Sequence, residues 1–201
     1  MTGAERVVEI IRTVLPTPHG TFDLVGFRDV VTGAEHLALL SPHGPLGSAQ
    51  DATTVRVHSE CLTGEAFGSL RCDCDAQLNR SLAEVADRGG VVVYLRGHEG
   101  RGVGLLHKLR AYRLQDVGLD TVEAQMALGL PVDGREYGAA VAILRHLAVT
   151  RVVLLTGNPD KVGALRAGGI EVAEVRPIAV PPTADNSAYL QAKRERLGHA
   201  R

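Results

Sequence analysis

Short apolar segments bounded by polar turns divide the chain into strands. Two of them, "GVVVYL" at 90–95 and "RVVLL" at 151–155, are apolar almost throughout, which is typical of strands covered on both faces. A third, "TTVRVHSE" at 53–60, alternates apolar and polar residues and predicts a strand that ends just before Cys61. Two more, "GTFDLVGFRD" at 20–29 and "AEHLALLS" at 34–41, flank the turn "VVTG" and predict a β-hairpin.

Helical periodicity fills the intervals between these strands. The segment "AQLNRSLAEVADRGG" places Leu78, Leu82 and Val85 at helical spacing and ends at a glycine. Further helices are predicted at 104–118, 135–149 and 159–169, and a last strand at 170–175. Because strands and helices alternate, we expect an α/β fold with a mixed, largely parallel sheet that is flanked by helices and includes an N-terminal β-hairpin region.

The regular pattern breaks after Pro177, where the segment "AVPPTADN" begins at residue 179. We therefore expect a single domain over residues 1–178. The remainder, 179–201, is expected to be a charged C-terminal tail that is helical or disordered.

Composition and charge exclude several classes of protein. The 201 residues carry a formal net charge of −1, so no overall basic field favours nucleic acid or an anionic membrane. No segment has the roughly 18 consecutive apolar residues of a membrane-spanning helix. The N-terminal "MTGAERVVEI" lacks the apolar stretch of a signal peptide. We expect a cytoplasmic protein that binds neither nucleic acid nor membrane.

All three cysteines lie in one segment, "CLTGEAFGSLRCDC", from Cys61 to Cys74. An odd number of cysteines in a cytoplasmic chain favours metal binding or catalysis over disulfides. Three thiolates suit a zinc ion that keeps one coordination position for water, as catalytic zinc sites do. Two alternatives stay open. His58 could close the site as a fourth ligand, or the thiols could simply be buried, although Arg71 and Asp73 are poor neighbours for buried thiols.

A glycine-rich segment, "RGHEGRGVG" at 96–104, follows one buried strand and opens a predicted helix. Its glycines let backbone N–H groups approach a ligand, and a helix N-terminus favours anions. Arg101 adds a group that can grip phosphate oxygens. Glu99 would repel phosphate unless it binds a metal or accepts hydrogen bonds from a base. A plain glycine-rich turn is the alternative interpretation.

Two further polar clusters stand at the ends of predicted elements. Asp133 and Arg135 stand where the helix at 135–149 begins, so Asp133 could belong to a site or could cap that helix. Thr156, Asn158 and Lys161 follow the strand at 151–155, at the carboxyl end where open α/β sheets bind ligands. Turn formation alone would also explain the sequence around Asn158.

Together these segments resemble the signature blocks of the GTP cyclohydrolase II family. The blocks are "VRVHSECLTGEAFGSLRCDCDAQL", "YLRGHEGRGVGLLHKLRAYRLQD", "DTVEAQMALGLPVDGREYG" and "LLTGNPDK", in the family's order. The resemblance implies hydrolysis of GTP to a diaminopyrimidine ribosylamine phosphate, formate and pyrophosphate, the first committed step toward riboflavin. It also implies a homodimer. Because the chain has no preceding synthase half, we expect the stand-alone form of the enzyme.

The resemblance also implies roles for individual residues. Cys61, Cys72 and Cys74 would hold one zinc ion, and Mg²⁺ would accompany the triphosphate. Arg135 would be the nucleophile on the α-phosphorus, with Asp133 as its proton acceptor, although a phosphate clamp is an alternative because guanidinium is almost always protonated. Tyr112 would act at the opened ring, unless it is a core tyrosine. The implied substrate contacts are Arg56, Val57, His58, Ser59, Glu60, Gln77, Glu99, Gly100, Arg101, Thr121, Thr156 and Lys161.

Three positions depart from the pattern of the family. Asp75 stands where glycine is usual, and Gln125 and Gly157 stand where asparagine is usual. None is an implied ligand or nucleophile, but they leave room for a variant that opens the purine ring and stops at a formylated pyrimidine, or that serves a specialised pathway. A nucleotide-binding sensor with a structural zinc is a further alternative.

Overall fold

A seven-stranded sheet runs through the part of the chain that the computed structural model describes, namely residues 6–43, 51–178, 180–183, 186–187, 191 and 195–196. The order of the strands across the sheet is β1-β2-β3-β5-β4-β6-β7. Their bounds are β1 Val7–Thr17, β2 Gly20–Asp29, β3 Glu35–Leu40, β4 Thr53–Ser59, β5 Val91–Leu95, β6 Arg151–Leu155 and β7 Glu171–Arg176.

The sheet is half antiparallel and half parallel. Strands β1, β2, β3 and β5 pair antiparallel in that order, and β5, β4, β6 and β7 pair parallel. This confirms the mixed α/β sheet and the hairpin, which is formed by β2 and β3. Strand β1 was not predicted. It is an edge strand in which only Val7 is buried, so its sequence carries no alternation that a core would impose.

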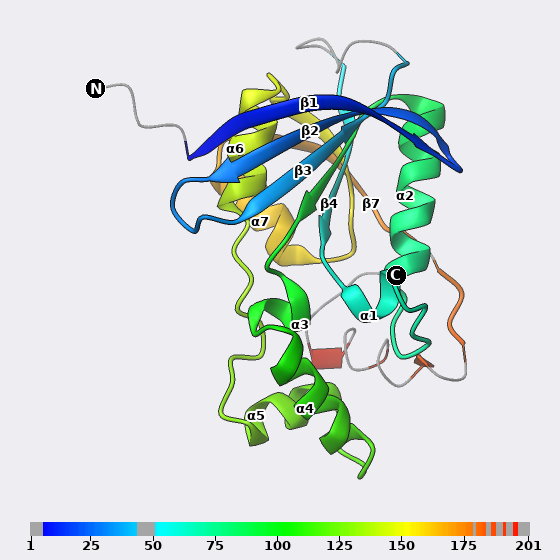
Figure 1. The fold of residues 1–201 in the computed structure, drawn as a ribbon, viewed down its shortest axis with the longest axis vertical. Helices are drawn as coiled ribbons and strands as arrows, with labels where there is room; N and C mark the ends of the chain where they lie inside the picture. The colour runs from blue at the N-terminus through cyan, green and yellow to red at the C-terminus, as the bar shows by residue number, and fades with distance from the viewer. Residues whose placement is uncertain are drawn as a thin grey trace.

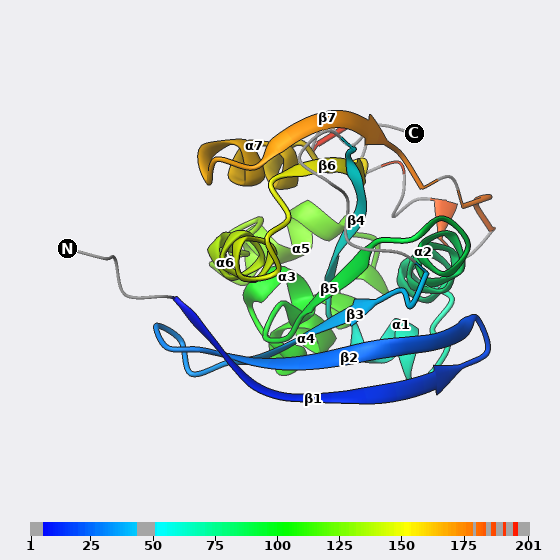
Figure 2. The same cartoon turned by 90° about the horizontal axis from the view of Figure 1, so that it is seen from above.

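Helices cover both faces of the sheet, and further helices lie beyond one end of its strands (Figures 1 and 2). One face carries α2, and the other carries α6 and α7, while α1, α3, α4 and α5 lie beyond the ends of β4 and β5. Their bounds are α1 Leu62–Glu65, α2 Cys74–Arg88, α3 Glu99–Gly102, α4 Leu105–Gln115, α5 Thr121–Ala127, α6 Gly138–His146 and α7 Pro159–Ala167. None of the described helices has the length and hydropathy needed to span a membrane.

The apolar core forms two layers because successive side chains of a strand point to opposite faces. On β5, Val91 and Val93 belong to the larger apolar cluster, which includes residues of α6 and α7. Val92 belongs to the smaller apolar cluster, together with Phe22 of β2 and Val85 of α2. The prediction that this strand is covered on both faces is therefore confirmed.

Two local features differ from what the sequence indicated. Helix α6 begins at Gly138 with Tyr137 as its N-cap residue, so Asp133 lies outside the helix and does not cap it. Helix α5 was not predicted. It begins with a capping box: the Asp120 carboxylate accepts from the backbone N–H groups of Val122 and Glu123, and the Glu123 carboxylate accepts from the Asp120 backbone N–H. Most residues of the tail 179–201 lie outside the described ones, so the expectation that this tail is helical or disordered stays a prediction.

Candidate active site

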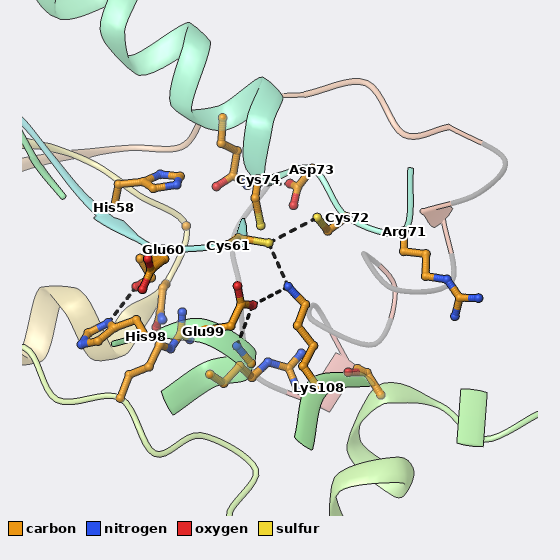
Figure 3. Close-up of a pocket in the computed structure, with 18 of the residues that line it drawn as sticks. His58, Glu60, Cys61, Arg71, Cys72, Asp73, Cys74, His98, Glu99 and Lys108 are labelled. Carbon is orange, nitrogen blue, oxygen red and sulfur yellow. Dashed lines mark hydrogen bonds and ion pairs between the residues drawn. The ribbon is translucent and has the colours of Figure 1, made fainter. Parts of the chain in front are cut away.

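The three cysteines meet where β4 ends and α2 begins. Cys61 follows β4, Cys74 is the first residue of α2, and Cys72 lies in the loop before it. Their sulfur atoms all lie within 4.8 Å of one another, and the Sγ atoms of Cys61 and Cys72 are 3.8 Å apart (Figure 3). The spacing along the chain therefore does bring three soft donors together, as a metal site requires.

The surroundings of the cysteines suit a cation. Hydrogen bonds from Cys72 and Cys74 lower the pKa of the Cys61 thiol far below its ordinary value, and the Lys108 ammonium adds to this. Gly64 leaves room for the sulfurs, because a Cβ at this position would lie 2.8 Å from the Sγ of Cys72 and 3.2 Å from that of Cys61. A thiolate-rich cluster in a cradle that a single methyl group would fill fits a zinc ion.

His58 does not belong to this cluster, so the alternative of a fourth histidine ligand is not supported. Its Nε2 lies 2.8 Å from Glu65 Oε1, and its ring stacks on Tyr94 with centroids 5.6 Å apart. Tyr94 in turn donates its hydroxyl to the other oxygen of Glu65 at 2.5 Å. Burial raises the pKa of Glu65 to about 7. Among the described residues, the group suited to a metal consists of the three cysteines alone.

The polar face of β4 points into the site and not into solvent. Arg56 and His58 are buried beneath α2, while Val55 and Val57 on the other side join the core. The Arg56 guanidinium donates to Leu155 O at 2.8 Å and to Gln77 Oε1 at 2.7 Å. Burial lowers its pKa to about 10, so it stays charged at neutral pH.

The glycine-rich segment is a strained loop that joins β5 to α4. Arg101 has φ of +64°, an uncommon conformation for a residue with a side chain, and its carbonyl accepts from the Gly134 N–H at 2.9 Å. At Gly102, a Cβ would lie 2.9 Å from the Gly134 carbonyl carbon, so only glycine permits this approach. The contact brings the loop of Glu99 and Arg101 against the loop of Asp133 and Arg135.

Asp133 and Arg135 form a close ion pair in the loop before α6. The Arg135 Nε donates to Asp133 Oδ1 at 2.9 Å, and its Nη2 donates to the other carboxylate oxygen. Burial alone would raise the pKa of Asp133, but the hydrogen bonds from Arg135 outweigh it and leave the pKa below its ordinary value. Asp133 therefore stays ionised at neutral pH.

The end of β6 supplies a third group of polar residues. Asn158 is the N-cap of α7 and accepts from the Asp160 N–H at 2.8 Å, and Thr156 Oγ1 accepts from the Asn158 N–H at 3.0 Å. The buried Lys161 donates to the Val57 carbonyl at 2.8 Å. Asn158 thus has the turn role that was its alternative, and the turn presents Thr156 and Lys161 to the site.

One cavity of about 520 Å³ receives almost all the predicted site residues. That volume is within the range of about 300–1,000 Å³ that small-molecule sites have. Two predicted residues do not line it: Val57 is a core residue that contributes only its carbonyl, and Asp133 stands behind Arg135. The predicted residues that do line it are Arg56, His58, Ser59, Glu60, Cys61, Cys72, Cys74, Gln77, Glu99, Gly100, Arg101, Tyr112, Thr121, Arg135, Thr156 and Lys161.

Several residues of the cavity were not predicted as site residues. Arg71 lies over the ring of Tyr112 at 4.8 Å, and Lys108 contacts Cys61. His98 Nδ1 lies 3.1 Å from Ser59 Oγ. Ile178, Val180 and Pro182 form an apolar part of the wall. The only sequence signal for His98 was its position inside the glycine-rich segment. Nothing in the sequence after Pro177 indicated that residues of this segment would line the cavity.

We expect His98 to make the protein less stable in acid. Burial lowers the pKa of His98 to about 4, whereas the imidazole of an unfolded chain has a pKa near 6.5. As the pH falls through this interval, the unfolded chain binds a proton that the folded chain does not. His98 therefore lowers the free energy of unfolding by about 2–3 kcal/mol at a pH of about 4.5.

Urea unfolding of the wild type and of His98→Asn, at about pH 7 and about pH 4.5, measures this difference. The variant should lose about 2–3 kcal/mol less than the wild type between the two pH values. His43→Asn, at an exposed histidine, is the matched control. Equal losses in the wild type and His98→Asn would contradict the expectation.

Comparison with known proteins assigns the chain to a family. The model of the family "GTP cyclohydrolase II" matches residues 7–177. GTP cyclohydrolase-2 of Streptomyces coelicolor is 57% identical over 194 residues, which cover 96% of this chain and 86% of that protein. Riboflavin biosynthesis protein RibBA of Salinispora tropica is 52% identical over 197 residues. These cover 97% of this chain and 48% of RibBA, so the chain spans about half the length of that relative.

A solved structure shares the fold. RibBX of A. baumannii, a two-domain 3,4-dihydroxy-2-butanone 4-phosphate synthase, aligns with a TM-score of 0.50 and 24% identity, over 89% of this chain and 42% of that chain. At this identity the likeness concerns the fold alone. The family model and the identity to Streptomyces coelicolor GTP cyclohydrolase-2 show that the chain belongs to the GTP cyclohydrolase II family, the enzymes of riboflavin biosynthesis whose substrate is GTP.

Proposed function

We propose that this chain hydrolyses GTP completely, to a diaminopyrimidine ribosylamine phosphate, formate and pyrophosphate. One observation carries the proposal: the three-cysteine cluster and Arg135 line the same cavity of about 520 Å³. Ring opening and loss of pyrophosphate act on opposite ends of GTP, so the complete reaction needs both groups within the reach of one nucleotide.

We propose zinc as the metal that Cys61, Cys72 and Cys74 hold. The donor set and the space left by Gly64 suit it, as described above. Zinc bound there would supply a Lewis acid that activates water at neutral pH, the chemistry that zinc-dependent base deaminases use against a ring carbon. The remaining residues bind and orient the substrate.

Three positive side chains and the Glu99 carboxylate are suited to opposite ends of GTP. Arg56, Arg101 and Lys161 are suited to phosphate oxygens and would hold the triphosphate together with Mg²⁺. Glu99 is a hydrogen-bond acceptor next to the cysteines, so it is suited to the N–H groups of the guanine edge. Tyr112, whose hydroxyl lies 3.3 Å from Thr63 Oγ1, would act at the opened ring.

Arg135 is best suited to clamp the α-phosphate. A nucleophilic guanidine would have to lose its proton to Asp133, but the ion pair lowers the pKa of Asp133. In the clamp role, the guanidinium stabilises the charge that develops as water bonds to the α-phosphorus and the bond to pyrophosphate breaks. Asp133 then orients Arg135 through the paired hydrogen bonds at Nε and Nη2.

Incubation of the purified protein with GTP and Mg²⁺, with product mass spectrometry, tests this proposal. Formate and pyrophosphate are assayed separately, with and without a zinc chelator. We expect equal amounts of the two products and loss of formate after chelation. Pyrophosphate without formate would support the variant that stops at a formylated pyrimidine. No turnover in the zinc-loaded protein would contradict the proposal.

Substitution of Gly64 tests the metal site without removing a donor. Gly64→Ala should displace the sulfurs of Cys61 and Cys72, because its Cβ would lie 2.8–3.2 Å from them. We expect a loss of zinc affinity on the order of 10-fold or more. Gly163→Ala in α7 is the matched control, since nothing lies within 4 Å of a Cβ there. Zinc affinity is measured by competition with a chromophoric chelator, and equal affinity in both variants would refute the fit.

We also propose a cytoplasmic homodimer. The edge strand β1 exposes Ile10, Ile11 and Val14 at 54%, 62% and 57%, and such an apolar surface is suited to a second copy of the chain. Light scattering at several concentrations measures the mass, and replacement of Ile11 by aspartate should favour the monomer. A monomer at every concentration would contradict the proposal.

A further inference from the structure

Lys108 bridges the cysteine cluster and the glycine-rich loop. It stands on α4, and its Nζ lies 3.1 Å from the Sγ of Cys61 and 2.5 Å from Glu99 Oε1 (Figure 3). The side chains of Lys108 and Glu99 are only 12% and 9% exposed. A buried ammonium that contacts a cysteine sulfur has a defined position, and the roles proposed above do not use it.

The partners of Lys108 fix that position. The carboxylate of Glu99 also accepts from the Gly100 N–H at 3.0 Å and from the Leu62 N–H at 2.6 Å. Leu62 follows Cys61 directly in the chain. Glu99 therefore attaches the glycine-rich loop to the backbone beside Cys61 and holds the ammonium at the sulfur. On its other side, Lys108 Nζ lies 5.8 Å from the ring centroid of Tyr112, a position that attracts a cation.

The contact between Lys108 and Cys61 bears on the charge of the metal site. Three thiolates and one Zn²⁺ have a net charge of −1, and a negative site in a partly buried cavity is costly without a nearby cation. Lys108 and Glu99 form an ion pair with no net charge, so Lys108 does not cancel the charge of the site as a whole. Its ammonium N–H, 3.1 Å from the Cys61 Sγ, stabilises the negative charge on that sulfur locally. Residues that hydrogen-bond to metal ligands typically change metal affinity by about 10- to 100-fold.

We propose that Lys108 is a positioning residue for the metal site: it donates an N–H to the Cys61 thiolate, stabilises the negative charge on that sulfur and so raises zinc affinity. The inference rests on the proposed function, because it requires that the cysteines hold zinc. It predicts a role in metal binding that exists before any GTP enters.

The test measures the zinc dissociation constant without substrate, by competition with a chromophoric chelator. Lys108→Met and Lys108→Gln remove the charge and keep the length of the side chain approximately. We expect both to bind zinc about 10- to 100-fold more weakly than the wild type. Lys108→Arg keeps the charge and should recover part of the loss. Arg110→Met removes one charge from an exposed position of the same helix and is the matched control, with wild-type affinity expected.

A second measurement separates metal binding from folding. The thermal midpoints of the metal-free variants are compared with that of metal-free Arg110→Met. Weaker zinc binding with an unchanged midpoint supports the inference. Wild-type zinc affinity in both Lys108 variants would overturn the inference. It would also be overturned if zinc affinity fell only in those variants whose metal-free thermal midpoint is lower than that of Arg110→Met. If the wild type itself binds no zinc, the proposed function fails, and that outcome is distinct from a wild type that binds zinc independently of Lys108.

Discussion

Cys72→Ser is expected to abolish the release of formate from GTP. A serine hydroxyl does not ionise near neutral pH and is a poor substitute for a soft thiolate, so the metal loses one of its three donors. The chain has three cysteines and all three belong to the cluster, so no other cysteine can replace Cys72. We expect formate release to fall by on the order of 10³-fold or more.

Formate and bound zinc are both measured in this variant, because the two should be lost together. Leu70→Ser, two residues away and 63% exposed, introduces the same side chain into the same loop and should keep both. Residual pyrophosphate release in Cys72→Ser would show that the two ends of GTP react independently. Wild-type formate release from Cys72→Ser protein would remove the cysteines from the mechanism.

Arg135→Ala is expected to suppress pyrophosphate release. The substitution removes the guanidinium that Asp133 orients, and it leaves the Asp133 carboxylate as a negative charge behind the phosphate site. Loss of a positioned charge that stabilises a transition state costs on the order of 10²–10³-fold in rate. Formate release should fall less, because Arg135 is paired with Asp133 and is assigned to the phosphate end of the substrate.

Intact-protein mass spectrometry of the wild type distinguishes the two roles of Arg135. In the wild type quenched during turnover, a phosphate clamp leaves the protein mass unchanged, whereas a nucleophile leaves a covalent nucleotide on Arg135. Arg113→Ala, at an exposed position of α4, is the control and should release pyrophosphate at the wild-type rate. Equal rates in Arg135→Ala and Arg113→Ala would refute both roles.

The alternation in β4 shows how far a sequence pattern can be interpreted. The segment 53–60 correctly predicted a strand, because a period of two is imposed by the pleat. An alternating strand usually has one face in water, but here Arg56 and His58 are buried under α2. Local spacing determines which side chains share a face, whereas what covers that face depends on residues far along the chain, such as Gln77.

The sequence by itself determined the α/β class, most of the helices and strands, the cysteine cluster and a set of site residues of which almost all line the cavity. The elements follow from periodicity and the cysteine cluster from close spacing in the chain, whereas most of the site residues follow from the resemblance of the sequence motifs to the family. Strand β1 and helices α1, α3 and α5 were not predicted, because an exposed edge strand and short helices carry weak patterns.

Only the tertiary structure decided which of these residues act on one another. His58 contacts Glu65 and is not a ligand of the cysteine cluster. Asp133 pairs with Arg135 and does not cap a helix, and Lys108 contacts Cys61. Lys108 and Cys61 are 47 positions apart in the chain. Contacts between residues so far apart in the sequence are fixed by the packing of whole helices and strands, and no local sequence pattern predicts them.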